Sequence, residues 1–133
     1  MPEVLAPADG EVITANGDAL PVDRAINTMA SVLYDAVAVA GGADSVAALC
    51  RGYAMHFVAE AYKHAKPVAA FGVGVDLLDH LGVTVDLASG VSDQGVVTSI
   101  GAENAFPSGL LDAFADEIGK HRAWERETDT IPA

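Results

Sequence analysis

The chain has 133 residues, which suits one domain with a hydrophobic core of its own. No apolar run approaches the roughly 20 residues of a membrane-spanning helix, so no membrane partner is expected. The 19 acidic and 7 basic residues give a net charge of −12, which repels nucleic-acid phosphates, so nucleic acid is not expected as a partner either. The opening residues Met1–Val4 do not resemble a secretory signal, and Cys50 is the single cysteine. Both features favour a cytoplasmic location.

The first part of the chain predicts a β-hairpin arm. Residues Glu11–Thr14 alternate in polarity, Asn16-Gly17 is a strong hairpin turn signal, and Leu20–Val22 returns. We expect this arm to lie over the rest of the domain.

Two short runs are apolar on both faces, which is typical of central parallel strands. They are Ala36–Ala40 and Val68–Phe71. Gly41-Gly42 permits a sharp exit from the first, and Asp44 or Ser45 can cap the helix that begins there.

A helix is expected between these strands. Gly52 interrupts the helical region that starts at Asp44, and a second helix is predicted from Tyr53 to Ala65. Lys66-Pro67 ends it. Its apolar stripe comprises Ala54, Phe57, Val58, Ala61 and Ala65.

The rest of the chain repeats the alternation of strand and helix. A short helix runs through Leu77-Leu78 to Gly82, followed by a short strand at Val83–Val85 and another at Gly95–Ser99. Pro107-Ser108 opens a last helix. Its predicted buried face comprises Leu110, Leu111, Phe114 and Ile118.

Alternating strands and helices predict a three-layer α/β fold, with a parallel sheet covered by helices on both faces. We place one domain at residues 1–124 and a polar tail at 125–133. Trp124, the last residue of the domain, is interpreted as the anchor of the tail.

These segments resemble one family. Residues 32–45, which hold the strand and the Gly-Gly turn, look like the central strand of the class I glutamine-amidotransferase-like superfamily. The segment Glu60–Ala70 and the endings His121–Trp124 and Ile131–Ala133 are similar to the C-terminal domain of large-subunit haem catalases. The resemblance covers nearly the whole chain and implies a flavodoxin-like domain that is a fragment of a larger catalase chain.

The sequence departs from that superfamily at its start. Members begin with a strand and helix before the segment that matches Glu3–Ala6, and no such βα unit is present here. Since that unit supplies the middle strand, two strands lose a neighbour. The resemblance therefore implies that the catalase core domain or a second copy of the chain completes the fold, as in a homo-oligomer. The haem would belong to the absent core, and no cofactor is expected in this chain.

The turn after Val68–Phe71 is the main candidate for chemistry. In active relatives a nucleophilic cysteine occupies this strand-to-helix elbow, where helix N–H groups stabilise an oxyanion. Here the matching residues are Gly72, Val73 and Gly74, which provide no nucleophile. The resemblance implies a vestigial elbow and a chain that is not an enzyme by itself.

Other candidate sites are weaker. His56, Glu60 and His64 share a helix face at i, i+4 and i+8, and they would need a fourth ligand to hold zinc; a solvated stripe is the alternative. Cys50 lies within a predicted helix, where an inert thiol is the commoner case.

A phosphate of a nucleotide or flavin would suit the two glycine turns that precede helices. Asp44 and Asp76, near the starts of those helices, would repel such an anion.

These observations leave three alternative functions for the chain. The first is a non-catalytic accessory domain of a catalase, which dismutates hydrogen peroxide in its absent haem core; this domain would stabilise the oligomer and have chaperone-like activity. The second is a PfpI-type hydrolase or amidotransferase-like enzyme, which the turn at Gly72 disfavours. The third is a flavin- or nucleotide-binding module.

Overall fold

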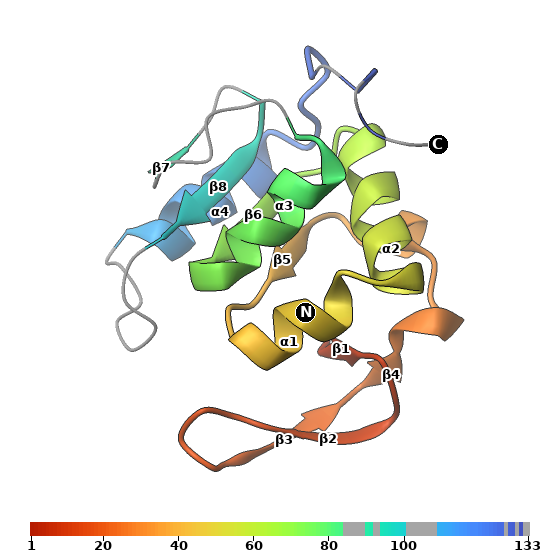
Figure 1. Ribbon diagram of the computed structural model, residues 1–133. Coiled ribbons are helices and arrows are strands. Elements are labelled where there is room, and N and C mark those ends of the chain that lie inside the picture. The colour runs from red at the N-terminus through yellow and green to blue at the C-terminus, as the bar shows by residue number, and fades with distance from the viewer. Residues whose placement is uncertain (84–89, 92–93, 101–108, 127, 130, 132–133) are drawn as a thin grey trace.

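The main sheet has four strands in the order β5-β6-β8-β7 in the computed structural model (Figure 1). The structure describes residues 1–83, 90–91, 94–100, 109–126, 128–129 and 131. The strands are β5 (Val37–Val39), β6 (Val68–Phe71), β7 (Gly90–Val91) and β8 (Val96–Ser99). β5, β6 and β8 are parallel, as the apolar runs predict, while β7 pairs antiparallel with β8, which the sequence did not predict.

Helices cover both faces of this sheet, which confirms the three-layer α/β prediction (Figure 1). They are α1 (Ala43–Leu49), α2 (Gly52–Lys63), α3 (Val75–Leu81) and α4 (Leu110–Gly119). Alternation along β6 places Val68 and Ala70 among residues of α2 and α3, and Ala69 among those packed on α4. None of the described helices is both long enough and apolar enough to span a membrane.

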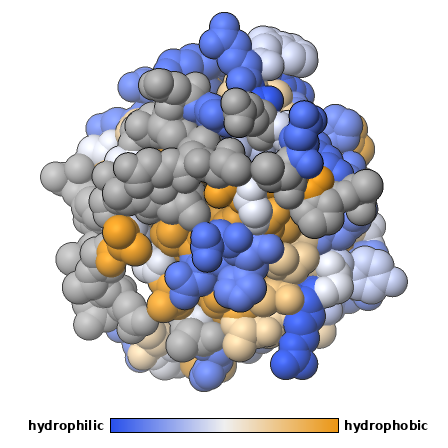
Figure 2. All heavy atoms as spheres, turned by 45° about the horizontal axis from the view of Figure 1, so that its top comes forward, coloured by the Kyte–Doolittle hydropathy of each residue, from blue (hydrophilic) through white to orange (hydrophobic). Residues whose placement is uncertain are grey.

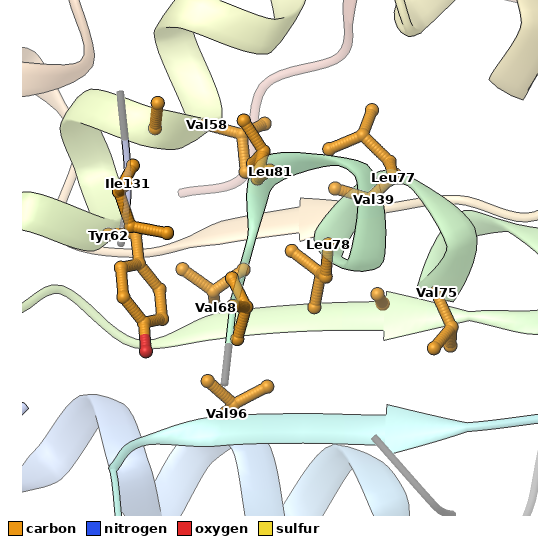
Figure 3. Close-up of a cluster of buried hydrophobic side chains, with 13 residues drawn as sticks. Val39, Val58, Tyr62, Val68, Val75, Leu77, Leu78, Leu81, Val96 and Ile131 are labelled. Carbon is orange, nitrogen blue, oxygen red and sulfur yellow. The ribbon is translucent and has the colours of Figure 1, made fainter. Parts of the chain in front are cut away.

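The larger core lies between the sheet and the α2–α3 layer (Figure 3). Leu77 and Leu78 of α3 are fully buried against Val68 and Val96 of the sheet. The five stripe residues predicted for α2 are all buried, with Ala61 0% exposed. Each buried Val, Leu or Phe side chain contributes about 1.5–3 kcal/mol. This layer therefore holds most of the apolar burial among the described residues.

The N-terminal segment forms two small ribbons beside the main sheet. β1 (Leu5–Ala6) pairs parallel with β4 (Arg24–Ala25), and β2 (Gly10–Ile13) pairs antiparallel with β3 (Ala19–Val22). Two 3₁₀ turns, Ile26–Thr28 and Ser31–Leu33, then lead to β5.

The predicted hairpin therefore forms, but the expectation that it lies over the domain is wrong. Ile13 is 68% exposed and Leu20 40% exposed, and the ribbon extends away from the body (Figure 1). Its alternating pattern is too weakly apolar to hold it against the core, because Glu11 and Pro21 pair at its centre.

The predicted buried face of the last helix is partly wrong. Leu110 is buried and Phe114 packs beside it, as expected, but Leu111 is 64% exposed and Ile118 39% exposed. The third inward position is Glu117, which is only 7% exposed. Positions 110, 114 and 117 form one helical stripe, so the inward face is rotated by about one residue from the apolar one.

Two expectations fall largely outside the described residues. Of the predicted strand at Val83–Val85, only Val83 is described, and it is buried without being part of a strand. Pro107-Ser108, the predicted start of the last helix, also lies outside them, and the described helix begins at Leu110.

Candidate functional site

The carboxyl ends of β5 and β6 are closed by contact between their two exit turns. A Cβ on Gly41 would lie 2.7 Å from the carbonyl oxygen of Phe71, and a Cβ on Gly74 would lie 2.8 Å from that of Val39. Real Cβ atoms do not approach backbone so closely, so glycine is required at both positions. The turns after the two strands therefore interlock, backbone against backbone, where a flavodoxin-like sheet normally holds its ligand.

Gly72 is the first residue after β6 and has a φ of +52°. It begins a 3₁₀ turn, Gly72–Gly74, which leads directly into α3. A positive φ between a strand and a helix is the backbone form in which an elbow presents a nucleophile. A Cβ at this position would lie 3.9 Å from the Cα of Gly41, so the closed turn has room for a small side chain that the sequence does not provide.

Acidic groups stand beside both turns. Asp44 is exposed in the first turn of α1, and Asp76 is exposed in the first turn of α3. A carboxylate near a helix N-terminus interacts favourably with it and repels a phosphate. The N-cap of α1 is Gly42, so the expected cap by Asp44 or Ser45 is wrong.

The three candidate metal ligands on α2 are not brought together. Glu60 and His64 are neighbours, with Oε2 and Nε2 3.6 Å apart, but His56 joins no group of three possible ligands within the described residues. Cys50 is the C-cap of α1, half-buried against the larger core.

A second cluster, which sequence reasoning missed, lies where α2 ends. After the C-cap His64, Ala65 has a φ of 59°, its N–H donates to Tyr62 (3.0 Å) and the N–H of Lys66 donates to Ala61 (3.1 Å). This is a Schellman motif with alanine in the left-handed position that glycine usually occupies. The turn directs Lys66 inward instead of toward solvent.

Lys66 is only 2% exposed, and its ammonium group connects two distant segments. Nζ donates to the carbonyl oxygens of Ser31 (2.6 Å) and Tyr34 (2.5 Å), so α2 is tied to the connection that precedes β5. Burial lowers the pKa of Lys66, the nearby Arg122 lowers it further, and Asp35 acts in the opposite direction.

Arg126 attaches the chain end to the same place. Its Nη1 donates to the carbonyl oxygens of Tyr62 (2.9 Å) and Lys66 (2.7 Å), and Nε donates to that of Gln94 (2.8 Å). Nη2 also contacts the oxygen of Gln94. Burial lowers the pKa of Arg126 to about 10. One side chain thus satisfies three carbonyl groups from two segments of the chain, the end of α2 and the segment before β8.

The prediction that Trp124 anchors the tail is wrong, because its side chain is 81% exposed. Arg126 and Ile131 are the anchors, and Ile131 belongs to the larger core (Figure 3). An arginine in a polar tail has no sequence signal of burial. The lysine that ends α2 likewise reads as an ordinary helix terminus.

The sheet order, the two helical layers and the interlocked strand ends define a flavodoxin-like α/β domain. A sequence model of the C-terminal domain found in long catalases matches residues 4–128. The chain belongs to this family of catalase C-terminal domains, which confirms the resemblance stated from its sequence.

Individual relatives agree with this assignment. The chain is 50% identical over 136 residues to "Catalase HPII" of Mycobacterium avium, with 98% of the chain and 19% of the relative covered. It is 37% identical to "Catalase HPII" of Pseudomonas aeruginosa, with 98% and 17% covered, and 31% identical to "Catalase-1" of Neurospora crassa, with 98% and 20% covered. The chain therefore spans about a fifth of the length of these relatives.

Proposed function

We propose that this chain is a non-catalytic accessory domain of a large-subunit haem catalase, in which it stabilises the folded enzyme and its oligomer. The match of residues 4–128 to the C-terminal domain of long catalases supports the parentage. The observation that carries the lack of chemistry is Gly72: the elbow position bears no reactive group.

The residues of the chain do not suit haem, which is proposed for the core of the parent protein. The side chains that hold haem iron are His, Cys, Met or Tyr. Among the tyrosines, Tyr53 is exposed, the hydroxyl of Tyr34 donates to Glu3 and the Tyr62 ring is covered by Arg126. His56, His64, His80 and His121 are all exposed. Dismutation of hydrogen peroxide is accordingly assigned to the core, and no step of it to these residues.

The edge of the sheet supports a docked partner. Among the described residues β5 pairs only with β6, so its other edge carries unpaired backbone groups. Val32 and Leu33, just before β5, are 69% and 67% exposed. We propose that the catalase core or a second copy of the chain covers this edge in a homo-oligomer, and that the same apolar residues give the isolated domain a chaperone-like affinity for unfolded chains. The single half-buried cysteine supports a cytoplasmic location.

Two experiments test the assignment. Reading the coding sequence upstream of Met1 should reveal a catalase core in frame. Deleting this domain from that full-length protein should then preserve peroxide decomposition at first, while heat inactivation becomes faster and the oligomer dissociates more readily. Full resistance to heat together with an unchanged oligomer after deletion would contradict the accessory role.

The hydrolase alternative is tested on the chain itself. Purified protein carrying Cys50→Ala should show no turnover of acyl or glyoxal substrates. Cys50 is the single thiol of the chain, so turnover by this variant would come from another group of the domain. Such turnover would overturn the non-catalytic assignment.

A further inference from the structure

Basic side chains gather around one hollow of this acidic protein. Four of the seven Lys and Arg residues line a cavity of about 400 Å³ at the carboxyl end of α2, in a chain whose net charge is −12. They are Lys63, Lys66, Arg122 and Arg126, and His64 lies with them. We call this cavity the basic hollow. The tail passes beside the end of α2, where the N–H of Ala123 donates to the carbonyl of Ala65 (2.7 Å) (Figure 1).

Local carboxylates compensate this charge only in part, because no described carboxylate forms an ion pair with Lys66 or Arg126. Lys66 and Arg126 donate to backbone carbonyl oxygens, and neither has a carboxylate within ion-pair distance among the described residues. Asp35 and Glu117 act on them from farther away. Both cations are nevertheless buried, and burial lowers both pKa values, because removal from water disfavours the charged form.

The rim of the hollow carries two further cations. Lys63 is half-buried in the last turn of α2, and Arg122 donates to the carbonyl oxygen of His121 (2.7 Å). The only rim ion pair within the described residues is that of His64 with Glu60, at 3.6 Å. The carboxyl end of α2 contributes roughly half a negative charge. Four cations exceed that contribution, so the hollow favours an anion.

Two exposed apolar side chains flank the same hollow. Trp124 is 81% exposed and Val32 is 69% exposed, and both line it. On the face that Figure 2 shows, hydrophobic residues likewise lie around a group of hydrophilic ones. A free inorganic anion would use the cations alone, whereas a polypeptide can use the cations, the indole and the valine together.

We propose that the basic hollow is a docking site for an acidic polypeptide segment, whose carboxylates meet Lys63 and Arg122 while an apolar side chain packs on Trp124. The proposal goes beyond the accessory role and does not depend on it. The hollow is formed by residues of this domain alone and would be present without a catalase core.

Trp124 makes the site directly observable, because it is the single tryptophan of the chain and lines the hollow. The 133-residue protein would be titrated with a blocked glutamate-rich peptide that contains leucine but no aromatic residue, and indole fluorescence would be followed. We expect a saturable change that weakens as salt is raised, since the contacts are exposed ion pairs. Binding of an acidic peptide by a protein of net charge −12 would be local, because the overall field opposes it.

The variants separate the site from net charge. The double variant Lys63→Gln/Arg122→Gln should weaken binding about tenfold, which corresponds to about 1.4 kcal/mol for two exposed ion pairs. Arg24→Gln/Arg51→Gln removes the same charge away from the hollow and should bind like the unmodified protein. Circular dichroism checks that both variants fold, and calorimetry repeats the titration with Trp124→Phe, which should retain the electrostatic part of the affinity.

Three results would overturn the proposal. The first is no saturable change with the unmodified protein at low salt. The second is an equal loss of binding in both double variants. The third is saturation by inorganic phosphate or free glutamate at the concentration at which the peptide saturates, because the hollow would then be a site for a small anion and not for a polypeptide.

Discussion

The guanidinium carbon of Arg126 lies 4.2 Å from the centre of the Tyr62 ring, while Nη1 of the same arginine donates to the Tyr62 carbonyl oxygen at 2.9 Å. A single residue of the tail thus contacts both the side chain and the backbone of the most deeply buried turn of α2. Tyr62 is 0% exposed, so these interactions are shielded from water.

Arg126→Met should lower the free energy of unfolding by about 2 kcal/mol. Methionine keeps the unbranched stem of the side chain but ends before the guanidinium group, so the carbonyl groups of Tyr62, Lys66 and Gln94 lose this donor. The neutral methionine avoids the desolvation cost of a buried charge, which offsets part of the lost hydrogen-bond energy. Urea unfolding followed by circular dichroism measures it, with the exposed Arg51→Met as the control, for which less than about 0.5 kcal/mol is expected. Equal midpoints for the two variants would contradict the role of Arg126.

Lys66→Met should lower the free energy of unfolding by about 1–2 kcal/mol and loosen the segment before β5. Methionine fills the space but donates nothing to the carbonyl groups of Ser31 and Tyr34. Limited proteolysis should therefore cut faster around the Ser31–Leu33 turn. Lys63→Met, on the half-buried rim of the same helix, is the control; cleavage that rises equally in both variants would exclude a specific tie through Lys66.

These two residues show why the sequence predicted the layers better than the site. The apolar stripe of α2 and the apolar run of β6 are local sequence patterns, and each predicts directly which residues are buried. Lys66 and Arg126 meet across 60 positions of sequence, and no local pattern records that a lysine at a helix end turns inward.

The error on α4 has a related origin. Glu117 takes the inward position that the pattern assigned to Ile118. It accepts from Lys120 at the end of α4 at 2.5 Å, and its charge acts on Arg126 of the tail. The sequence likewise showed Gly41 and Gly74 only as glycines that permit a turn. Glycine is required there because the two turns are in close backbone contact, and that contact follows from the spacing of β5 and β6 in the folded sheet.

Gly74→Ala should destabilise the protein, whereas Gly119→Ala should not. A methyl group on Gly74 would meet the carbonyl oxygens of Val39 at 2.8 Å and Ala40 at 3.1 Å, so the interlocked turns must separate, at a cost of about 1–3 kcal/mol. Gly119 ends α4 with nothing within 4 Å of the added Cβ, and alanine there should add up to about 0.5–1 kcal/mol. Thermal unfolding of the pair checks the contrast. A stable Gly74→Ala protein would mean that the turns are not in contact.

Tyr34 should make stability fall at high pH. Burial, together with a hydrogen bond from its hydroxyl to Glu3 Oε2 (2.6 Å) and the charge of that carboxylate, raises the pKa of Tyr34 to about 12 from 10.0. Because the folded pKa is the higher one, the stabilisation is complete below pH 10 and is lost as pH rises toward 12. Melting temperatures across this range should fall less steeply for Tyr34→Phe.

Glu3→Gln provides the matching test of cause. It keeps the shape of the partner but removes its charge, so the pKa of Tyr34 should move back toward 10.0. Ultraviolet titration of tyrosinate, with circular dichroism at each pH to confirm the fold, measures the shift. A titration curve identical to that of the unmodified protein would show that burial alone sets the pKa.

Gly72→Cys should place a thiol on the elbow without creating an enzyme. The variant is made on a Cys50→Ala background. The left-handed φ of +52° should cost about 1–2 kcal/mol for any residue with a Cβ, and the nearest atom to that Cβ, the Cα of Gly41, is 3.9 Å away, so the side chain fits.

A thiol becomes a nucleophile only when a base or a positive environment favours its thiolate. The charged side chains in the first turns of α1 and α3, the two helices that follow the interlocked turns, are Asp44 and Asp76. Their carboxylates disfavour a thiolate. The variant should therefore react with a disulfide reagent but show no turnover of acyl or glyoxal substrates, as should Val73→Cys, which carries its thiol one residue beyond the elbow. Turnover by Gly72→Cys alone would show that the elbow retains a working oxyanion site, and that the loss of one side chain is all that separates this domain from an enzyme.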